Sequence, residues 1–116
     1  MVASPTQSHQ ALLYRLSGDK NPLHADPAFA KMGGFDKPIL HGLCSFGIVC
    51  KAAVDAMLDG DVAQVARYQA RFAGVLFPGE TIETSLWREG KQILINAKCV
   101  ERNAPVISNA AITLRA

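Results

Sequence analysis

Residues 42–58, GLCSFGIVCKAAVDAML, decide how the rest of the chain is arranged. Apolar side chains recur on nearly every side of the helix that this stretch would form, and Lys51 and Asp55 are its only charged residues. A helix that is apolar nearly all round is normally enclosed by other structure. We therefore expect a helix from about Gly42 to Leu58 that is buried on most of its sides.

The second half of the chain changes from helical to strand periodicity. Short segments with alternating or β-branched apolar residues are separated by turn residues at Pro78-Gly79, Gly90-Lys91 and 103–105. The predicted strands are residues 65–77, 81–88, 92–101 and 106–114. Helices followed by four consecutive strands predict an α+β fold, in which a meander forms an antiparallel β-sheet wrapped around the central helix.

The first quarter of the chain contains helix signals. Ser4-Pro5 has the composition of a helix start, with Gln7 at capping-box spacing, and the pattern runs to Gly18. Asp26-Pro27 then caps a short helix through Lys31, which Gly33-Gly34 ends. Because nothing resembling a strand precedes Ser4, this interpretation leaves the domain without an N-terminal strand.

Composition excludes several classes of protein. The 116 residues fit one domain, and a formal net charge of +2 gives no field that would attract nucleic acid. Three cysteines without a C-x-x-C pair argue against a disulfide framework or a structural zinc site. No apolar run reaches about 18 residues, so we expect no membrane span, and the absence of a signal-peptide pattern favours the cytoplasm.

Polar residues concentrate in one eight-residue turn, which holds Asp19, Asn21, His24 and Asp26. A carboxylate and an imidazole in a loop constrained by glycine and proline form the kind of pair that transfers protons. Gly42 stands at the start of the long helix, where free backbone N–H groups favour an oxyanion. These residues therefore suggest acid–base chemistry beside an oxyanion site.

Two other interpretations of the same residues remain open at this point. Asp19 would serve equally well as a turn residue that bonds its own backbone, and His24 as a hydrogen-bonded core histidine. A metal site would need Asp19, His24, Asp26 and His41, whose spacing lacks a compact ligand repeat. We assign no metal to the chain.

Three motifs carry a resemblance to a known family. They are Y-R-L-S-G-D-K-N-P-L-H at residues 14–24, I-L-H-G-L-C at 39–44 and F-P-G-E at 77–80. Together they resemble the MaoC-like hydratases, and especially the type-two (R)-specific enoyl-CoA hydratases, over nearly the whole chain. The resemblance implies a hot-dog fold, in which the sheet wraps the long helix.

The resemblance also implies a reaction and roles for four residues. Asp19 and His24 would form the dyad that activates water, Asn21 would support them, and the Gly42 N–H would bind the thioester oxygen. The reaction would hydrate trans-2-enoyl-CoA to (3R)-3-hydroxyacyl-CoA in fatty-acid or sterol side-chain β-oxidation. Coenzyme A is then part of the substrate, and no separate cofactor is expected.

Other residues receive secondary roles. Phe46, Cys44 and Arg71 are candidates for the substrate pocket, although packing is the favoured role of Phe46 and Tyr14 because most buried aromatic residues belong to the core. Cys44 has no obvious base beside it, so we do not interpret it as a nucleophile. Arg71, Lys51 and Lys37 are candidates for contacts with the phosphates of the coenzyme, although isolated cations usually belong to a solvated face. His41 is expected to orient the loop.

A single hot-dog unit without its first strand would need a partner. We expect residues 1–116 to be one half of a double hot-dog enzyme, a homodimer, or a subunit paired with a hot-dog chain that lacks the dyad. The alternatives from other functional classes are a non-catalytic acyl-thioester binding or scaffolding subunit and, third, a hot-dog thioesterase. The intact Asp19 and His24 argue against the first, and the G-D-x-N-P-x-H loop argues against the second.

Overall fold

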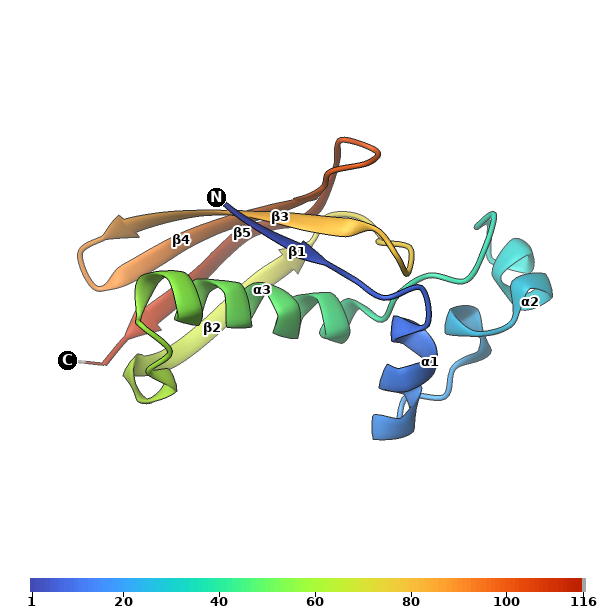
Figure 1. The fold of residues 1–116 in the computed structure, drawn as a ribbon, viewed down its shortest axis with the longest axis horizontal. Coiled ribbons are helices and arrows are strands. Elements are labelled where there is room, and N and C mark those ends of the chain that lie inside the picture. Colours follow the sequence, from blue (N-terminus) through green and yellow to red (C-terminus); the bar gives the residue numbers. More distant parts are fainter. Residues whose placement is uncertain (116) are drawn as a thin grey trace.

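A computed structural model of the protein describes residues 1–115 and shows a five-stranded antiparallel sheet packed on one long helix (Figure 1). The helix is α3 (Gly42–Met57), which agrees with the predicted span to within one residue. The strands are β1 (Val2–Pro5), β2 (Val65–Phe72), β3 (Thr81–Glu89), β4 (Gln92–Cys99) and β5 (Ala104–Leu114), arranged in the order β1-β3-β4-β5-β2. The predicted α+β class is confirmed.

The core lies between α3 and one face of the sheet. Burial alternates along β4, where Ile93, Ile95, Ala97 and Cys99 are buried and the alternate residues are half-buried or exposed. On the helix side, Val49 and Ala53 are completely buried against this face. One stripe of α3, through Leu43, Gly47, Lys51 and Asp55, stays exposed. The rest of the helix is mostly buried or half-buried, which agrees with the prediction that it is buried on most of its sides (Figure 1).

The first strand, which we expected to be missing, is present. Residues Val2 to Pro5 pair with β3, with Val2 opposite Thr84 and Pro5 opposite Thr81. Ser4 and Pro5 therefore belong to a strand rather than to a helix start. Four residues are too few to show a period, and a proline is tolerated at the sheet edge, where no partner requires its N–H. The first helix, α1 (Gln10–Tyr14), begins later than predicted.

The four strands expected as a meander have a different order. β3, β4 and β5 follow one another through tight turns, but β2 pairs with β5 and not with β3. β2 also ends at Phe72 rather than at residue 77, and residues 73–80 cross from one edge of the sheet toward the other. Hairpin turns are encoded locally, whereas the pairing of β2 with β5 depends on contacts that a pattern along the chain does not contain.

A helical segment between β1 and α3 lies at the N-terminal end of α3 (Figure 1). It consists of α1, two 3-10 helices (Arg15–Ser17 and Pro22–His24) and α2 (Pro27–Met32). As predicted, the Asp26 carboxylate caps α2 by accepting from the N–H groups of Ala28 and Phe29. Within residues 1–115, no helix is both long enough and apolar enough to cross a bilayer.

Candidate active site

The polar turn at residues 18–24 is held by its own side chains. Gly18 adopts a φ of +121°, which favours glycine, and turns the chain out of the preceding 3-10 helix. The Asp19 carboxylate accepts from the Asn21 N–H at 3.3 Å, and the Asn21 side-chain oxygen accepts from the Leu23 N–H at 3.0 Å. Asn21 therefore shapes the turn that presents Asp19 and His24.

His24 has one ring nitrogen fixed by the backbone. Its Nδ1 lies 2.9 Å from the carbonyl oxygen of Ile39, in the segment that leads into α3. Because a carbonyl only accepts, Nδ1 must carry the proton and donate. In the neutral ring Nε2 then carries the lone pair, so this nitrogen is available to accept a proton from a bound molecule.

His41 holds the same turn from the opposite side. Its Nε2–H donates to the backbone carbonyl of Asp19 at 2.9 Å, and its ring stacks on His24 with centroids 3.8 Å apart. Tyr14 packs against the ring of His41 at 4.6 Å. His41 is almost completely buried, and its Nδ1 has no hydrogen-bond partner among the described residues. The loop-orienting role expected of His41 matches this geometry.

Asp19, His24 and His41 bring three polar atoms together. A carboxylate oxygen of Asp19 and one ring nitrogen of each histidine lie within 4.8 Å of one another. The described residues show no direct hydrogen bond between the side chains of Asp19 and His24, so the separation suits a small molecule such as water that bonds to both. The same three groups have the spacing of a metal site, whereas the carboxylate of Asp26 is used in capping α2.

Gly42 is the first residue of α3 and follows His41 directly. The N–H groups of Cys44 and Ser45 bond to the His41 carbonyl, while the N–H groups of the first residues in a helix have no acceptor within the helix. A cavity of about 240 Å³ opens beside Gly42, and Phe72 lies across it. A Cβ at position 42 would approach Phe72 Cε1 to 3.3 Å, so any side chain here would crowd the phenylalanine ring that lines the cavity.

A second cavity, of about 210 Å³, contains His24. Its other lining residues are Ser8, Ala11, Leu12, Ala25, Lys37, Pro38 and Pro78. Lys37 is therefore the cation that the structure places beside the candidate dyad. One cavity is thus lined by Gly42 and the other by His24.

Three residues expected at the substrate pocket lie outside the two cavities. Cys44 is buried in the core, which raises the pKa of its thiol. Phe46 packs edge-on against Tyr68, with ring centroids 3.9 Å apart, and Arg71 is exposed on β2. None of these three residues is among the described residues that line the two cavities.

Sequence patterns missed two features of the site. Phe72 faces Gly42 from the end of β2, and only the pairing of β2 with β5 brings it there. Glu80 was noticed within F-P-G-E, but its partner Arg102 lies in a turn 22 residues later. An ion pair between two turns has no periodic signal in the sequence.

Comparison with known proteins supports the resemblance. The family model described as "MaoC like domain" matches residues 2–110. Enoyl-CoA hydratase ChsH3 of Mycobacterium tuberculosis is 53% identical over 112 residues, which are 96% of this chain and 39% of that protein. The peroxisomal enoyl-CoA hydratase 2 of Arabidopsis thaliana is 50% identical over 103 residues, which are 89% of this chain and 33% of that protein. The chain thus spans well under half the length of these relatives.

Solved structures show the same fold. The full-length peroxisomal multifunctional enzyme type 2 from Drosophila melanogaster superposes with a TM-score of 0.96 at 43% identity, over 98% of this chain and 21% of that one. An (R)-hydratase from A. caviae, at 22% identity and a TM-score of 0.74, covers 98% of this chain and 90% of that chain and shows likeness of fold alone. The chain belongs to the MaoC-like domain family and has its hot-dog fold.

Proposed function

We propose that this chain is the catalytic hot-dog unit of an (R)-specific enoyl-CoA hydratase. The observation that carries the proposal is that a carboxylate oxygen of Asp19 and a ring nitrogen of His24 lie within 4.8 Å of each other, beside His41, which directly precedes the first residue of α3. The relatives named enoyl-CoA hydratase, which are about 50% identical to this chain, support the same reaction. The substrate class is a trans-2-enoyl thioester of coenzyme A.

Water would be bound between the two members of the dyad. With Nδ1 of His24 donating to the Ile39 carbonyl, Nε2 would accept a hydrogen bond, as would the Asp19 carboxylate, so together they would orient the two protons of one water molecule. The lone pairs of the water oxygen then point away from both acceptors, toward C3 of the enoyl group. One acceptor takes a proton as the C3–O bond forms, and a proton is delivered to C2, so that one water is added in total.

Gly42 would stabilise the charge that develops in this step. As water attacks C3, electrons move to the thioester oxygen, which becomes an enolate oxygen until C2 is protonated. An N–H at the start of a helix is fixed in advance and lies at the positive end of the helix dipole. Loss of one such donor costs other enzymes about 3–4 kcal/mol of transition-state stabilisation. The cavity between Gly42 and Phe72 gives the thioester access to this N–H.

The stereochemistry of the product tests the proposed activity. We expect the purified protein to consume crotonyl-CoA, with loss of the enoyl-thioester absorbance, and to form the (3R) alcohol. An added dehydrogenase specific for (R)-3-hydroxyacyl-CoA should then reduce its nicotinamide cofactor, while an (S)-specific dehydrogenase should not. Signal from the (S)-specific enzyme alone, or no loss of absorbance with any enoyl-CoA, would contradict the proposal.

We further propose that a second hot-dog unit covers the site end of the molecule. Large apolar side chains are exposed there, on the helical segment and the start of α3: Leu12, Leu13, Leu16, Phe29, Met32 and Leu43. β1 and β2 form the two edges of the sheet, and exposed edges favour pairing. The ChsH1-ChsH2 complex of Mycobacterium tuberculosis contains a chain of similar fold, with a TM-score of 0.71.

The partner is a second copy of this chain or a hot-dog unit without the dyad. Light scattering at micromolar concentration tests the requirement for it. We expect the active species to have twice the mass of one hot-dog unit, whether from two chains or from a longer chain with two units. A stable, fully active single unit would contradict this assembly. Titration of active sites separates a homodimer, with two sites, from a heterodimer, with one.

A further inference from the structure

The segment that links β2 to β3, residues 73–80, contributes to the walls of both cavities of the candidate active site. Val75 and Leu76 line the cavity beside Gly42, and Pro78 lines the cavity beside His24. The Leu76 carbonyl accepts from the Leu40 N–H at 2.7 Å, only two residues before Gly42. The position of this linking segment therefore affects where α3 begins.

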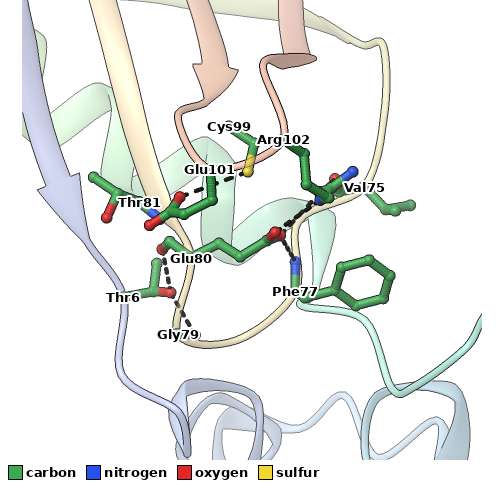
Figure 2. Close-up of polar contacts among 9 residues, drawn as sticks. All are labelled: Thr6, Val75, Phe77, Gly79, Glu80, Thr81, Cys99, Glu101 and Arg102. Carbon is green, nitrogen blue, oxygen red and sulfur yellow. Dashed lines mark hydrogen bonds and ion pairs between the residues drawn. The ribbon is translucent and has the colours of Figure 1, made fainter.

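An ion pair outside the cavities holds the linking segment. Nε of Arg102 donates to Oε2 of Glu80 at 2.7 Å, and Nη2 donates to Oε1 at 2.9 Å (Figure 2). Glu80 Oε1 also accepts from the Phe77 N–H at 2.7 Å, and Arg102 Nη2 donates to the Val75 carbonyl at 2.8 Å. The pair thus bonds to the backbone on both sides of Leu76.

The chemistry of this pair depends on its particular residue types. A guanidinium forms two parallel bonds to a carboxylate and still has a hydrogen for the Val75 carbonyl, whereas an ammonium is a compact charge without the planar fork. Partial burial works to raise the pKa of Glu80, but the hydrogen bonds from Arg102 and from the Phe77 N–H outweigh it and leave this pKa below its ordinary value. Glu80 therefore remains ionised at neutral pH.

Two further contacts restrict the segment. The ring of Phe77 lies 5.0 Å from both Arg102 and Lys37, so it links the ion pair to the cation at the His24 cavity. Thr6, directly after β1, donates its hydroxyl to the Glu80 carbonyl at 2.6 Å and accepts from the Gly79 N–H at 2.9 Å (Figure 2). These contacts leave the linking segment little freedom to move independently of the sheet.

We propose that Glu80 and Arg102 are positioning residues for the hydration reaction. By holding the backbone around Leu76, they fix the segment that ends at Gly42, and so fix the N–H that meets the thioester oxygen. This inference rests on the proposed hydratase function. Neither side chain needs to touch the substrate, so their loss should lower kcat more than it raises KM.

Two conservative variants and two controls test the proposal in the full-length protein. Glu80→Gln removes the charge of the carboxylate, and Arg102→Lys keeps the charge but removes the fork. Glu83→Gln is the matched control, because Glu83 lies on β3 and pairs with Lys98 rather than with the linking segment. Ile93→Val is the stability control: it should lower the melting temperature from the buried core of β4, and it removes none of the hydrogen bonds or ion pairs that hold residues 73–80.

Two readouts are measured for each variant. The first readout is kcat and KM for crotonyl-CoA. The second is the amide hydrogen exchange rate of Leu40 together with the amide chemical shift of Gly42. This second readout does not require the protein to be active. In both conservative variants we expect kcat to fall about tenfold, while KM stays within about threefold of the wild-type value. The reason is that an oxyanion donor acts mainly in the transition state, so its displacement affects kcat more than KM. Leu40 exchange should rise at least about tenfold, because its acceptor is no longer held. The two controls should keep wild-type kcat and KM and an unshifted Gly42 amide signal.

The outcomes separate this proposal from the proposed function. Unchanged Leu40 exchange and an unchanged Gly42 shift would overturn the positioning role even if both variants lose activity. If Leu40 exchange increases in Glu80→Gln and Arg102→Lys while their kcat stays at the wild-type value, the link to catalysis is overturned. The link is also overturned if Ile93→Val, with a melting temperature as low as that of these two variants, loses as much kcat as they do. A wild-type protein that hydrates no enoyl-CoA would refute the proposed function and, with it, the catalytic part of this inference.

Discussion

The imidazole rings of His24 and His41 stack at a centroid distance of 3.8 Å, and each ring donates a hydrogen bond to the backbone of the other's segment. His24 donates to Ile39, two residues before His41, and His41 donates to Asp19 in the turn that carries His24. This reciprocal arrangement joins the polar turn to the start of α3. The candidate dyad and the candidate oxyanion site are thereby held as one unit.

His41 should affect activity through this cross-link. In His41→Phe a ring still fills the space between Tyr14 and His24, but the donor to the Asp19 carbonyl is lost. We expect a loss of about 1 kcal/mol in the free energy of unfolding, from one hydrogen bond. We also expect kcat to fall about tenfold as Asp19 moves from its catalytic geometry. Steady-state kinetics and thermal unfolding measure the two effects.

The matched control is His9→Phe, which changes an exposed histidine outside the site. It should leave both kcat and the melting temperature at wild-type values. If His41→Phe also retained wild-type kcat, the cross-link would have no part in holding Asp19.

Gly42 should tolerate an added side chain poorly, for a reason of space. Its Cβ would approach Phe72 to 3.3 Å, and the larger side chain of valine would also fill the cavity where the thioester is expected. Valine keeps the backbone N–H but blocks the thioester from reaching it, so we expect Gly42→Val to lower kcat/KM by about a hundredfold, as large an effect as the loss of one oxyanion donor. Gly47→Ala on the same helix is the control, because nothing lies within 4 Å of its Cβ. Equal activity of the two variants would argue against an oxyanion role for Gly42.

The dependence of stability on pH should report the Glu80–Arg102 pair. Because the pKa of Glu80 in the folded state lies below its ordinary value of 4.5, the unfolded chain takes up the proton first as pH falls. The stabilisation is therefore complete at neutral pH and is lost as pH falls below about 4.5, through the lower folded-state pKa. We expect Glu80→Gln to be about 1–2 kcal/mol less stable than the wild type at pH 7. The expected loss is this small because the Arg102 side chain is 36% exposed, so solvent weakens the ion pair.

Urea unfolding of the wild type and of Glu80→Gln from pH 7 to pH 3 measures this difference. It should shrink as the pH falls and vanish once Glu80 is protonated in the folded protein. A difference that stayed constant over the whole range would show that the carboxylate charge is not the cause. Glu83→Gln, whose ion pair with Lys98 has a longer separation of 3.8 Å, should show a smaller effect at pH 7.

The parts of the fold that the sequence predicted correctly are those with local signals. The apolar pattern of α3 and the turns around β3, β4 and β5 gave bounds within a few residues of the observed ones. The errors concern β1, which is four residues long, and β2, whose partner β5 is distant in sequence. Both strands exist because of long-range pairing, which periodicity along the chain does not encode.

The same distinction applies to the candidate site. The grouping of Asp19, Asn21 and His24 was visible because one turn contains all three. The stacking of His24 on His41 joins residues 17 positions apart, since 41 − 24 = 17, and the ion pair of Glu80 with Arg102 joins two separate turns. Contacts of this kind follow from the folded arrangement and have no signature in spacing.

The dyad itself can be tested directly with three variants and one assay. Asp19→Asn and His24→Ala each remove one acceptor of the proposed water, while Asp26→Asn changes a carboxylate in the same segment that only caps α2. Asparagine is a good helix N-cap, so the control should fold normally. Hydration of crotonyl-CoA is followed by the loss of enoyl-thioester absorbance, before and after dialysis against EDTA, which should have no effect on an acid–base dyad.

We predict that kcat falls at least about a hundredfold in Asp19→Asn and in His24→Ala, as expected for the loss of general acid–base catalysis. The control Asp26→Asn should remain within a few-fold of the wild type, and all three variants should keep the wild-type circular dichroism spectrum. If both dyad variants, correctly folded, hydrate crotonyl-CoA at near wild-type rates, then Asp19 and His24 do not perform the chemistry.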